Sequence, residues 1–267
     1  MKLAVHCIVK NEENYIWYAL TSVVAFADKI IVFDTGSSDK TVSIIKELQV
    51  HYPNIIFEEK GECDQKRHTE LRQEMIERTM SDWFMILDGD EVWSRRGMEE
   101  IMRVMSTEDT ECFIAPFYLC VGDVYHYSKK GAYTLRGKVV HATPRLFKNN
   151  KGLHWSGSYN HDAICDNEGR KVFEKEKVVF LQEKFWHLSH LRRSSIDDQE
   201  YSSGSSRKFK RRLTYFLIGK KIEEKIPEVF EENPGKYVKE MGVLESLKNF
   251  ILLFPLKISQ FFYEKKL

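Results

Sequence analysis

The chain has 267 residues, of which 42% are hydrophobic and 13% aromatic, and its 41 Lys and Arg nearly balance its 40 Asp and Glu. This composition provides for a sizeable core and excludes a globally disordered chain. The formal net charge of +1 gives no reason to expect a nucleic-acid partner.

The five cysteines are odd in number and never in CxxC spacing. This argues against a zinc site and against a disulfide framework, and it favours a reducing compartment. The first apolar run, Leu3–Val9, is too short for a signal peptide, and no stretch of 18 apolar residues offers a membrane span. We therefore expect a cytoplasmic protein.

Strand and helix patterns alternate over roughly the first 105 residues. Such alternation implies βαβ units and a parallel sheet covered on both faces, which is an α/β fold. The predicted elements in chain order are a strand at Leu3–Val9, a helix at Glu12–Ala27, a strand at Lys29–Asp34, a helix from Thr41, a strand at Ile55–Glu58, a helix at Gln65–Met80 and a strand at Trp83–Leu87.

From Glu111 onward the pattern changes to longer β segments, which we interpret as the second half of a mixed sheet plus a hairpin region. A Ser-rich polar break then ends in a basic run, and the patterns beyond it predict helices at Leu213–Ile226 and Leu244–Phe262. The expected division is a sheet domain at 1–192 with halves at 1–105 and 106–192, a flexible basic linker at 193–212 and a helical extension at 213–267.

The predicted parallel strands all end in polar, acid-rich segments, namely Lys10–Glu13, Asp34–Asp39 and Asp88–Glu91. Ligands of open α/β sheets bind outside the carboxyl ends of the strands. These three segments are therefore the expected ligand site.

The segment DGDE carries the strongest chemical signal. Asp88 and Asp90 are two residues apart on an extended segment and can converge on one cation, while Gly89 allows a ligand to approach the backbone closely. Such carboxylates suit Mg²⁺ or Mn²⁺, which complete their shells with water and phosphate oxygens. The alternative is an Asp-Gly turn that simply closes a strand.

Five segments, taken in order, resemble glycosyltransferase family 2, whose members are inverting enzymes of the nucleotide-diphospho-sugar transferase (GT-A) fold. The closest resemblance is to the bacterial-type subgroup with an NEE start and a DxDE core. It implies a three-layer α/β/α sandwich with a mostly parallel mixed sheet, here followed by a C-terminal helical extension. The segments are IVKNEE (Ile8–Glu13), VFDTGSSDKT (Val32–Thr41), DQKRH (Asp64–His68), WFMILDGDE (Trp83–Glu91) and RLFKN…WSGSYNHD (Arg145–Asp162).

The resemblance implies a donor site for a nucleotide-diphospho-sugar. An Arg at position 67 could reach the diphosphate, although a solvated helix face explains it as well, and His68 replaces the family's usual Asn. Glu12 also has a second reading, as an acid facing the positive end of a helix dipole. The donor-binding residues implied by the resemblance are Lys10, Asn11, Glu12, Asp34, Arg67, Asp88 and Gly89.

The resemblance also implies the remaining chemical roles. Asp162, in GSYNHD, matches the family's Glu as the general base that deprotonates the acceptor; an Asx turn is the alternative. The metal ligands are Asp88, Asp90 and a late His, for which we favour His187 over His190. Trp155 and Tyr159 are candidates to stack on an acceptor sugar, or else pack at a β edge.

The implied function is metal-dependent transfer of a sugar, with inversion, from a nucleotide-diphosphate donor, with a UDP-sugar favoured, to a glycan, lipid-linked or other acceptor hydroxyl. This function fits polysaccharide, lipopolysaccharide or glycoconjugate synthesis. Two alternatives stay open: a haloacid-dehalogenase-like phosphatase and a non-catalytic nucleotide-sugar-binding module. The apolar final segment, 244–262, offers a peripheral contact with the inner face of a membrane, and packing on the protein itself is the alternative.

Overall fold

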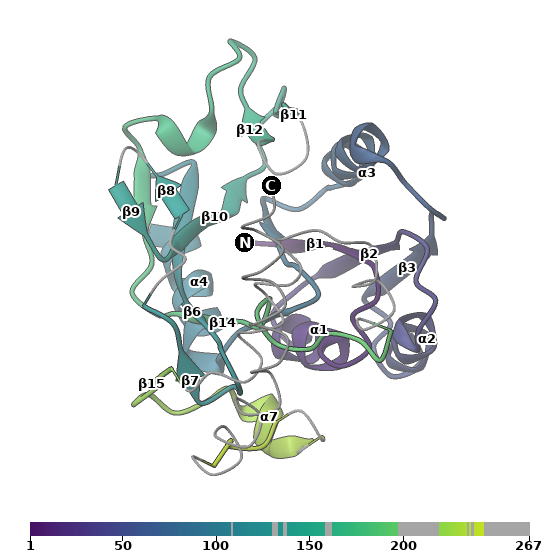
Figure 1. Cartoon of the computed structure of the whole chain (residues 1–267). Helices are drawn as coiled ribbons and strands as arrows, with labels where there is room; N and C mark the ends of the chain where they lie inside the picture. Colours follow the sequence, from purple (N-terminus) through teal and green to yellow (C-terminus); the bar gives the residue numbers. More distant parts are fainter. Residues whose placement is uncertain are drawn as a thin grey trace, which may run out of the picture.

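The computed structural model describes residues 1–107, 109–129, 133–135, 138–157, 162–196, 219–233, 235 and 238–242. Its centre is a mixed sheet with the strand order β3-β2-β1-β4-β10-β6-β14-β5, and β13 pairs with β6 beside this path. Helices cover both faces of the sheet (Figure 1). The α/β fold with a large mixed sheet is thus confirmed.

The first half of the sheet is parallel, as expected. β1 (Leu3–Val9) pairs with both β2 (Lys29–Asp34) and β4 (Trp83–Ile86), and β2 pairs with β3 (Ile55–Glu59). The strands β1, β2 and β4 are almost continuously buried, because helices lie on both faces.

Four helices cover the sheet: α1 (Ile16–Val24), α2 (Thr41–His51), α3 (Gln65–Glu77) and α4 (Arg95–Thr107). Apolar side chains of α1, α2 and α4 share one core cluster with alternate residues of β1 and β2. The side chains of Leu71 and Met75 in α3 pack on Ile31 and Phe33 from the opposite face. The result is a three-layer arrangement in which α3 lies across the sheet from α1 and α2 (Figure 1).

The first and third helices are shorter than predicted. The helix expected at Glu12–Ala27 begins only at Ile16, because Asn11 has a positive φ of 56° and the residues after it form a turn. The third helix begins as expected after Asp64, whose carboxylate accepts a hydrogen bond from the backbone N–H of Arg67 at 2.7 Å.

The second half of the sheet is mixed, as predicted. β10 (Ala142–Lys148) runs antiparallel to β4 and to β6 (Cys112–Leu119). β13 (Val178–Phe180) and β14 (Phe185–His187) run parallel to β6, and β14 pairs antiparallel with β5 (Glu91–Val92). Small hairpins flank the sheet, formed by β8 (Tyr133–Leu135) with β9 (Lys138–Val140) and by β11 (His154–Ser156) with β12 (Ala163–Cys165).

The helix expected at Leu213–Ile226 is wrong for its described part, residues 219–226. Lys220 and Lys221 form a short strand, β15, which pairs with β7 (His126–Tyr127), and the side chain of Ile222 enters a core cluster with Trp186. A helix follows instead at α7 (Glu228–Glu232). The helix expected at Leu244–Phe262 and most of the basic linker lie outside the described residues.

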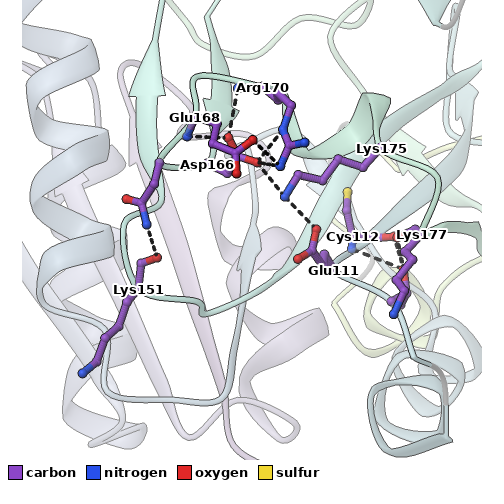
Figure 2. Close-up of polar contacts among 10 residues, drawn as sticks. Glu111, Cys112, Lys151, Asp166, Glu168, Arg170, Lys175 and Lys177 are labelled. Carbon is purple, nitrogen blue, oxygen red and sulfur yellow. Dashed lines mark hydrogen bonds and ion pairs between the residues drawn. The ribbon is translucent and has the colours of Figure 1, made fainter.

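A network of ion pairs holds the edge of the second half together (Figure 2). Lys175 bridges Glu111, at 2.9 Å, and Asp166, at 2.8 Å, and Arg170 pairs with Asp166 and with Glu168. These residues line a surface cavity of about 230 Å³. The acidic groups that line this cavity are thus paired with lysine or arginine side chains of the same lining.

None of the helices among the described residues is long and apolar enough to cross a membrane.

His6 is a buried titratable group in the sheet. Its ring stacks on Phe84 with a centroid separation of 4.8 Å, and its Nε2 lies 2.6 Å from the hydroxyl oxygen of Thr79. That hydroxyl donates its proton to the carbonyl of Met75, so Nε2 of His6 donates to Thr79. Burial lowers the pKa of His6 to about 3, and the native state therefore keeps the imidazole neutral.

We predict that acid destabilises the fold through His6. Between pH 6.5 and about 3 the unfolded chain binds a proton that native His6 does not, so stability falls with falling pH by about 1.4 kcal/mol per pH unit. A His6→Gln variant lacks this term. Denaturant unfolding at pH 7, 5.5 and 4.5 gives the free energy of unfolding of both proteins. The difference in favour of the wild type should become smaller as the pH falls. A constant difference would contradict the assignment.

Candidate active site

The candidate site lies where the chain order of the sheet reverses. β1 has β2 on one side and β4 on the other, so the chain continues toward opposite edges of the sheet after β1 and after β4 (Figure 1). Such a switch point, at the carboxyl ends of parallel strands, is where open α/β sheets bind ligands. The segments Lys10–Glu13, Asp34–Asp39 and Asp88–Glu91 all follow these strand ends.

The loops after β1 and β2 are hydrogen-bonded to each other through Asn11. Its backbone N–H donates to the hydroxyl of Ser37 at 2.9 Å, and its side-chain oxygen accepts from the N–H of Ser38 at 2.9 Å. The side chain of Lys10 extends outward and pairs with Glu62 at 3.2 Å. Asn11 thus fixes the shape of the site, while Lys10 lies at its exposed rim.

Asp34 presents a buried carboxylate at the end of β2, with 2% of the residue exposed. One oxygen, Oδ2, accepts hydrogen bonds from the N–H groups of Gly36, at 2.9 Å, and Ser37, at 3.0 Å. The other oxygen, Oδ1, is buried and has no hydrogen-bond partner among the described residues. A buried carboxylate oxygen without a donor is costly, so a hydrogen bond from a water or a ligand would stabilise Oδ1.

The carboxylates after β4 share one arginine. Arg145, on the neighbouring strand β10, donates from Nη2 to Asp88 Oδ2 at 2.8 Å and from Nε to Glu91 at 3.1 Å. Burial raises the pKa of Asp88, but Arg145 and then Arg72 outweigh it, and the pKa lies below its usual value. Burial raises the pKa of Glu91 to about 8 despite Arg145. Burial thus favours the uncharged form of Glu91 even beside Arg145, whereas Asp88 stays in its charged form.

Asp90 and His187 lie side by side. Nε2 of His187, the last residue of β14, is 3.8 Å from Oδ1 of Asp90, and both side chains are less than 10% exposed. Nη1 of Arg193 lies 3.9 Å from the other oxygen of Asp90 and 2.6 Å from Glu12. His190 belongs to the turn after β14.

The donor atoms around Asp90 fit a divalent ion, although the described residues do not form a complete ligand set. A carboxylate oxygen beside an imidazole nitrogen is a combination that Mn²⁺ accepts, and water or phosphate oxygens complete such shells. No group of three His, Cys, Asp or Glu arranged to hold a metal occurs among the described residues. Asp88, the third expected ligand, is instead engaged by Arg145.

Gly89 allows close packing between two loops of the site. A Cβ built on Gly89 would lie 2.9 Å from Cγ of Glu12 and 3.0 Å from Cγ1 of Val9. The space above this glycine is thus filled by Glu12 and β1. The approach of a ligand to the backbone at Gly89 stays a prediction.

A second group of site residues surrounds Arg72 of α3. Its guanidinium donates to Oδ2 of Asp162 at 2.6 Å and lies over the ring of Trp155, 4.6 Å from the ring centroid. Burial and then Arg72 lower the pKa of His68 to about 4, and both Asp162 and Asp88 act on it in the opposite direction. Arg72 and His68 therefore lie between the acids after β4 and Asp162.

Arg67 makes its ion pair within its own helix and not with this group. It is 47% exposed and pairs with Glu70 of the same helix at 3.2 Å. Tyr159 lies outside the described residues.

Sequence reasoning missed three arginines that contact the expected site residues: Arg72, Arg145 and Arg193. Arg145 was the only one within a segment that carried the family resemblance. Each makes its ion pair with a residue 54 to 181 positions away, and no local pattern reports such a pairing. A surplus of buried acid at the strand ends was the available signal that buried cations must lie nearby.

These features define an α/β protein with an acidic ligand site at the switch point of its sheet. The chain belongs to glycosyltransferase family 2, because the family described as "Glycosyl transferase family 2" matches residues 5–175.

Curated relatives agree with this family. The chain is 25% identical over 203 residues to an uncharacterized glycosyltransferase of Rickettsia bellii, covering 70% of this chain and 60% of the relative. It is 29% identical over 192 residues to the SPbeta prophage-derived glycosyltransferase SunS of Bacillus subtilis, covering 68% and 44%. The chain thus spans about half the length of the curated relatives it matches.

Solved structures show a partial likeness. TarS 1–349 of S. aureus in complex with UDP-GlcNAc has a TM-score of 0.48 at 12% identity, covering 80% of this chain and 70% of that one. The mannosyltransferase PcManGT from Pyrobaculum calidifontis, in complex with GDP-Man and Mn²⁺, has a TM-score of 0.44 at 12% identity, covering 86% and 67%.

We predict that Gly89→Ala destabilises the protein and displaces the acids beside it. The added methyl must push against buried Glu12 and Val9, which should cost about 1–3 kcal/mol of unfolding free energy. Gly242→Ala is the matched control, because no atom of the described residues lies within 4 Å of its added Cβ. Denaturant unfolding gives the free energy of unfolding of the wild type and of each variant. Equal stabilities of the two variants would show that the loops at Gly89 are not closely packed.

Proposed function

We propose that this chain transfers a sugar from a nucleotide-diphosphate sugar to an acceptor hydroxyl, with inversion and with the help of a divalent ion. The observation that carries the proposal is the pairing of Asp90 with His187 at the switch point, in a chain of glycosyltransferase family 2. The structure offers no observation that favours a phosphatase.

Asp34 is proposed to bind the donor's nucleoside. Its buried Oδ1 has no donor among the described residues, whereas Oδ2 is held by two backbone N–H groups. A carboxylate fixed in this way can accept a hydrogen bond from a base N–H or a ribose hydroxyl. A uracil N–H would suit it, and for this reason we favour a UDP-sugar.

Asp90 and His187 are proposed to hold the divalent ion, with Asp88 beside them. Such an ion, when bound, neutralises the donor's diphosphate and stabilises the charge on the departing nucleotide. Arg193 adds a positive charge near Asp90 and Arg145 adds one at Asp88, so both side chains keep the carboxylates oriented before the donor arrives. Mn²⁺ and Mg²⁺ both suit this oxygen-rich set.

Asp162 is proposed as the general base. Inverting displacement needs a group that takes the acceptor's hydroxyl proton while the oxygen attacks the anomeric carbon and the bond to the leaving diphosphate breaks. Arg72, on the same helix as His68, donates a hydrogen bond to Asp162. Asp162 and Asp88 both raise the pKa of His68, so Asp162 lies near enough to the acids after β4 to act on the same group. The acceptor, as a glycan, a lipid-linked molecule or another hydroxyl compound, stays a prediction, as does a membrane contact through the final residues.

We predict that Asp90→Asn abolishes sugar transfer while the protein stays folded. Wild-type protein with Mn²⁺ should release a nucleotide diphosphate from at least one member of a panel of nucleotide sugars, and EDTA should stop the release. Loss of a charged ligand should lower the rate by about 100-fold or more.

Asp109→Asn is the control for Asp90→Asn. Asp109 is an exposed acid paired with Lys177, away from the strand ends, and its variant should keep the wild-type rate. Normal turnover by Asp90→Asn would contradict the metal assignment, and release of inorganic phosphate would favour a phosphatase. Binding of a nucleotide sugar without any turnover would favour a non-catalytic module.

We also predict that Asp34→Asn weakens donor binding more than it slows turnover. Replacing the charged acceptor by an amide removes a charge-assisted hydrogen bond of about 1.5–3 kcal/mol, so the KM for the donor should rise about tenfold or more. Calorimetric titration with the nucleotide diphosphate should show the same loss. An unchanged dissociation constant would place the nucleoside elsewhere.

A further inference from the structure

We propose that Arg72 is a positioning residue for Asp162 and that Trp155 supports Arg72 in this task. The proposal rests on the proposed function, because it takes Asp162 as the general base. It assigns a role to an arginine that lies on α3, one turn beyond the positions that carry the family resemblance.

The first support is the geometry of the ion pair. Arg72 donates from Nη1 to Oδ2 of Asp162 at 2.6 Å, and the two side chains are only 20% and 5% exposed. Among the residues that the structure describes, the other oxygen, Oδ1, accepts no hydrogen bond. The arginine therefore fixes one carboxylate oxygen and leaves the other to take the proton of a hydroxyl.

The second support is the way in which the guanidinium itself is held. Its Cζ lies 4.6 Å from the ring centroid of Trp155, a cation–π contact that restricts the long side chain. The backbone N–H of Trp155 donates to Oε1 of Gln73 at 3.0 Å, so the β11–β12 hairpin is fixed to the same turn of α3.

Chain connectivity completes the argument. Asp162 immediately precedes β12, whose Ala163 pairs with Ser156 of β11. The hairpin and α3 thus place Arg72 and Asp162 together from opposite sides. Asp162 stands next to residues 158–161, which the structure does not describe, and the contact with Arg72 is the one that the described residues give to its carboxylate.

A double-mutant cycle on transfer kinetics tests the proposal. Arg72→Ala should lower kcat by about 100-fold, because a misplaced base loses most of its effect, and should change the donor KM by less than about threefold. Arg72→Lys should recover part of the rate, since it keeps the charge. In an Asp162→Asn background, Arg72→Ala should cause no further loss, because both changes remove the same contribution.

Arg78→Ala is the matched control. Arg78 follows the same helix and also pairs with carboxylates, Glu74 at 3.2 Å and Glu58, but it lies away from Asp162. Its loss should leave kcat within about twofold of the wild type, and melting temperatures compare the structural cost of the two changes. If Arg72→Ala does not fold, the cycle is built from Arg72→Lys, Asp162→Asn and the double variant that carries both changes.

The outcomes separate this proposal from the proposed function. If the wild type transfers sugar and Arg72→Ala lowers the rate equally with and without Asp162, Arg72 does not act through Asp162 and the proposal is overturned. A large rise in donor KM with unchanged kcat also overturns it, because it would make Arg72 a donor-binding residue. A wild type that transfers no sugar from any donor overturns the proposed function itself.

Discussion

The arrangement of the site depends on the ion pairs that Arg145 makes at the tip of β4. Three carboxylates follow this strand within four residues, and Glu91 is fully buried. Burying carboxylates is unfavourable unless cations lie beside them. Because β10 runs antiparallel to β4, its Arg145 reaches the tip from the side and bridges Asp88 and Glu91. The antiparallel strand β10 therefore supplies the positive charge that lies beside these acids.

The remaining acid, Asp90, is balanced by groups from the far end of the sheet domain. His187 ends β14, and Arg193 follows it in a segment that returns over the first loop. Arg145 thus pairs with Asp88 from one side and Arg193 lies near Oδ2 of Asp90 from the other. The imidazole of His187 lies beside Oδ1 of Asp90. The carboxylates of the site are therefore held by groups from two other segments of the chain, and the proposed divalent ion and diphosphate depend on this arrangement.

The sequence predicted the parallel half of the sheet well, because its strands are short apolar runs that end at acids and its helices show clear periodicity. It also predicted that Asp34 and Asp90 follow the ends of parallel strands, which the structure places as β2 and β4 on either side of β1. It failed where backbone or long-range contacts decide: a positive φ at Asn11 delays the first helix, and pairing with β7 makes a strand of Lys220 and Lys221. The partners of the acids were not predictable, because Arg72 and Arg145 meet them only in the folded chain.

The segment Arg192–Ser195 ties the end of the sheet domain back to its beginning. The carbonyl of Arg193 accepts from the N–H of Asn14 at 3.0 Å, the hydroxyl of Ser194 donates to Asp39 at 2.6 Å, and the N–H of Ser195 donates to Glu13 at 2.6 Å. The family match ends at residue 175, twenty positions before this clasp closes. Anyone trimming the protein to its smallest folded unit should therefore cut beyond Ser195. A fragment that ends at the last sheet strand keeps every strand of the large sheet but loses the contacts that hold the loops after β1 and β2.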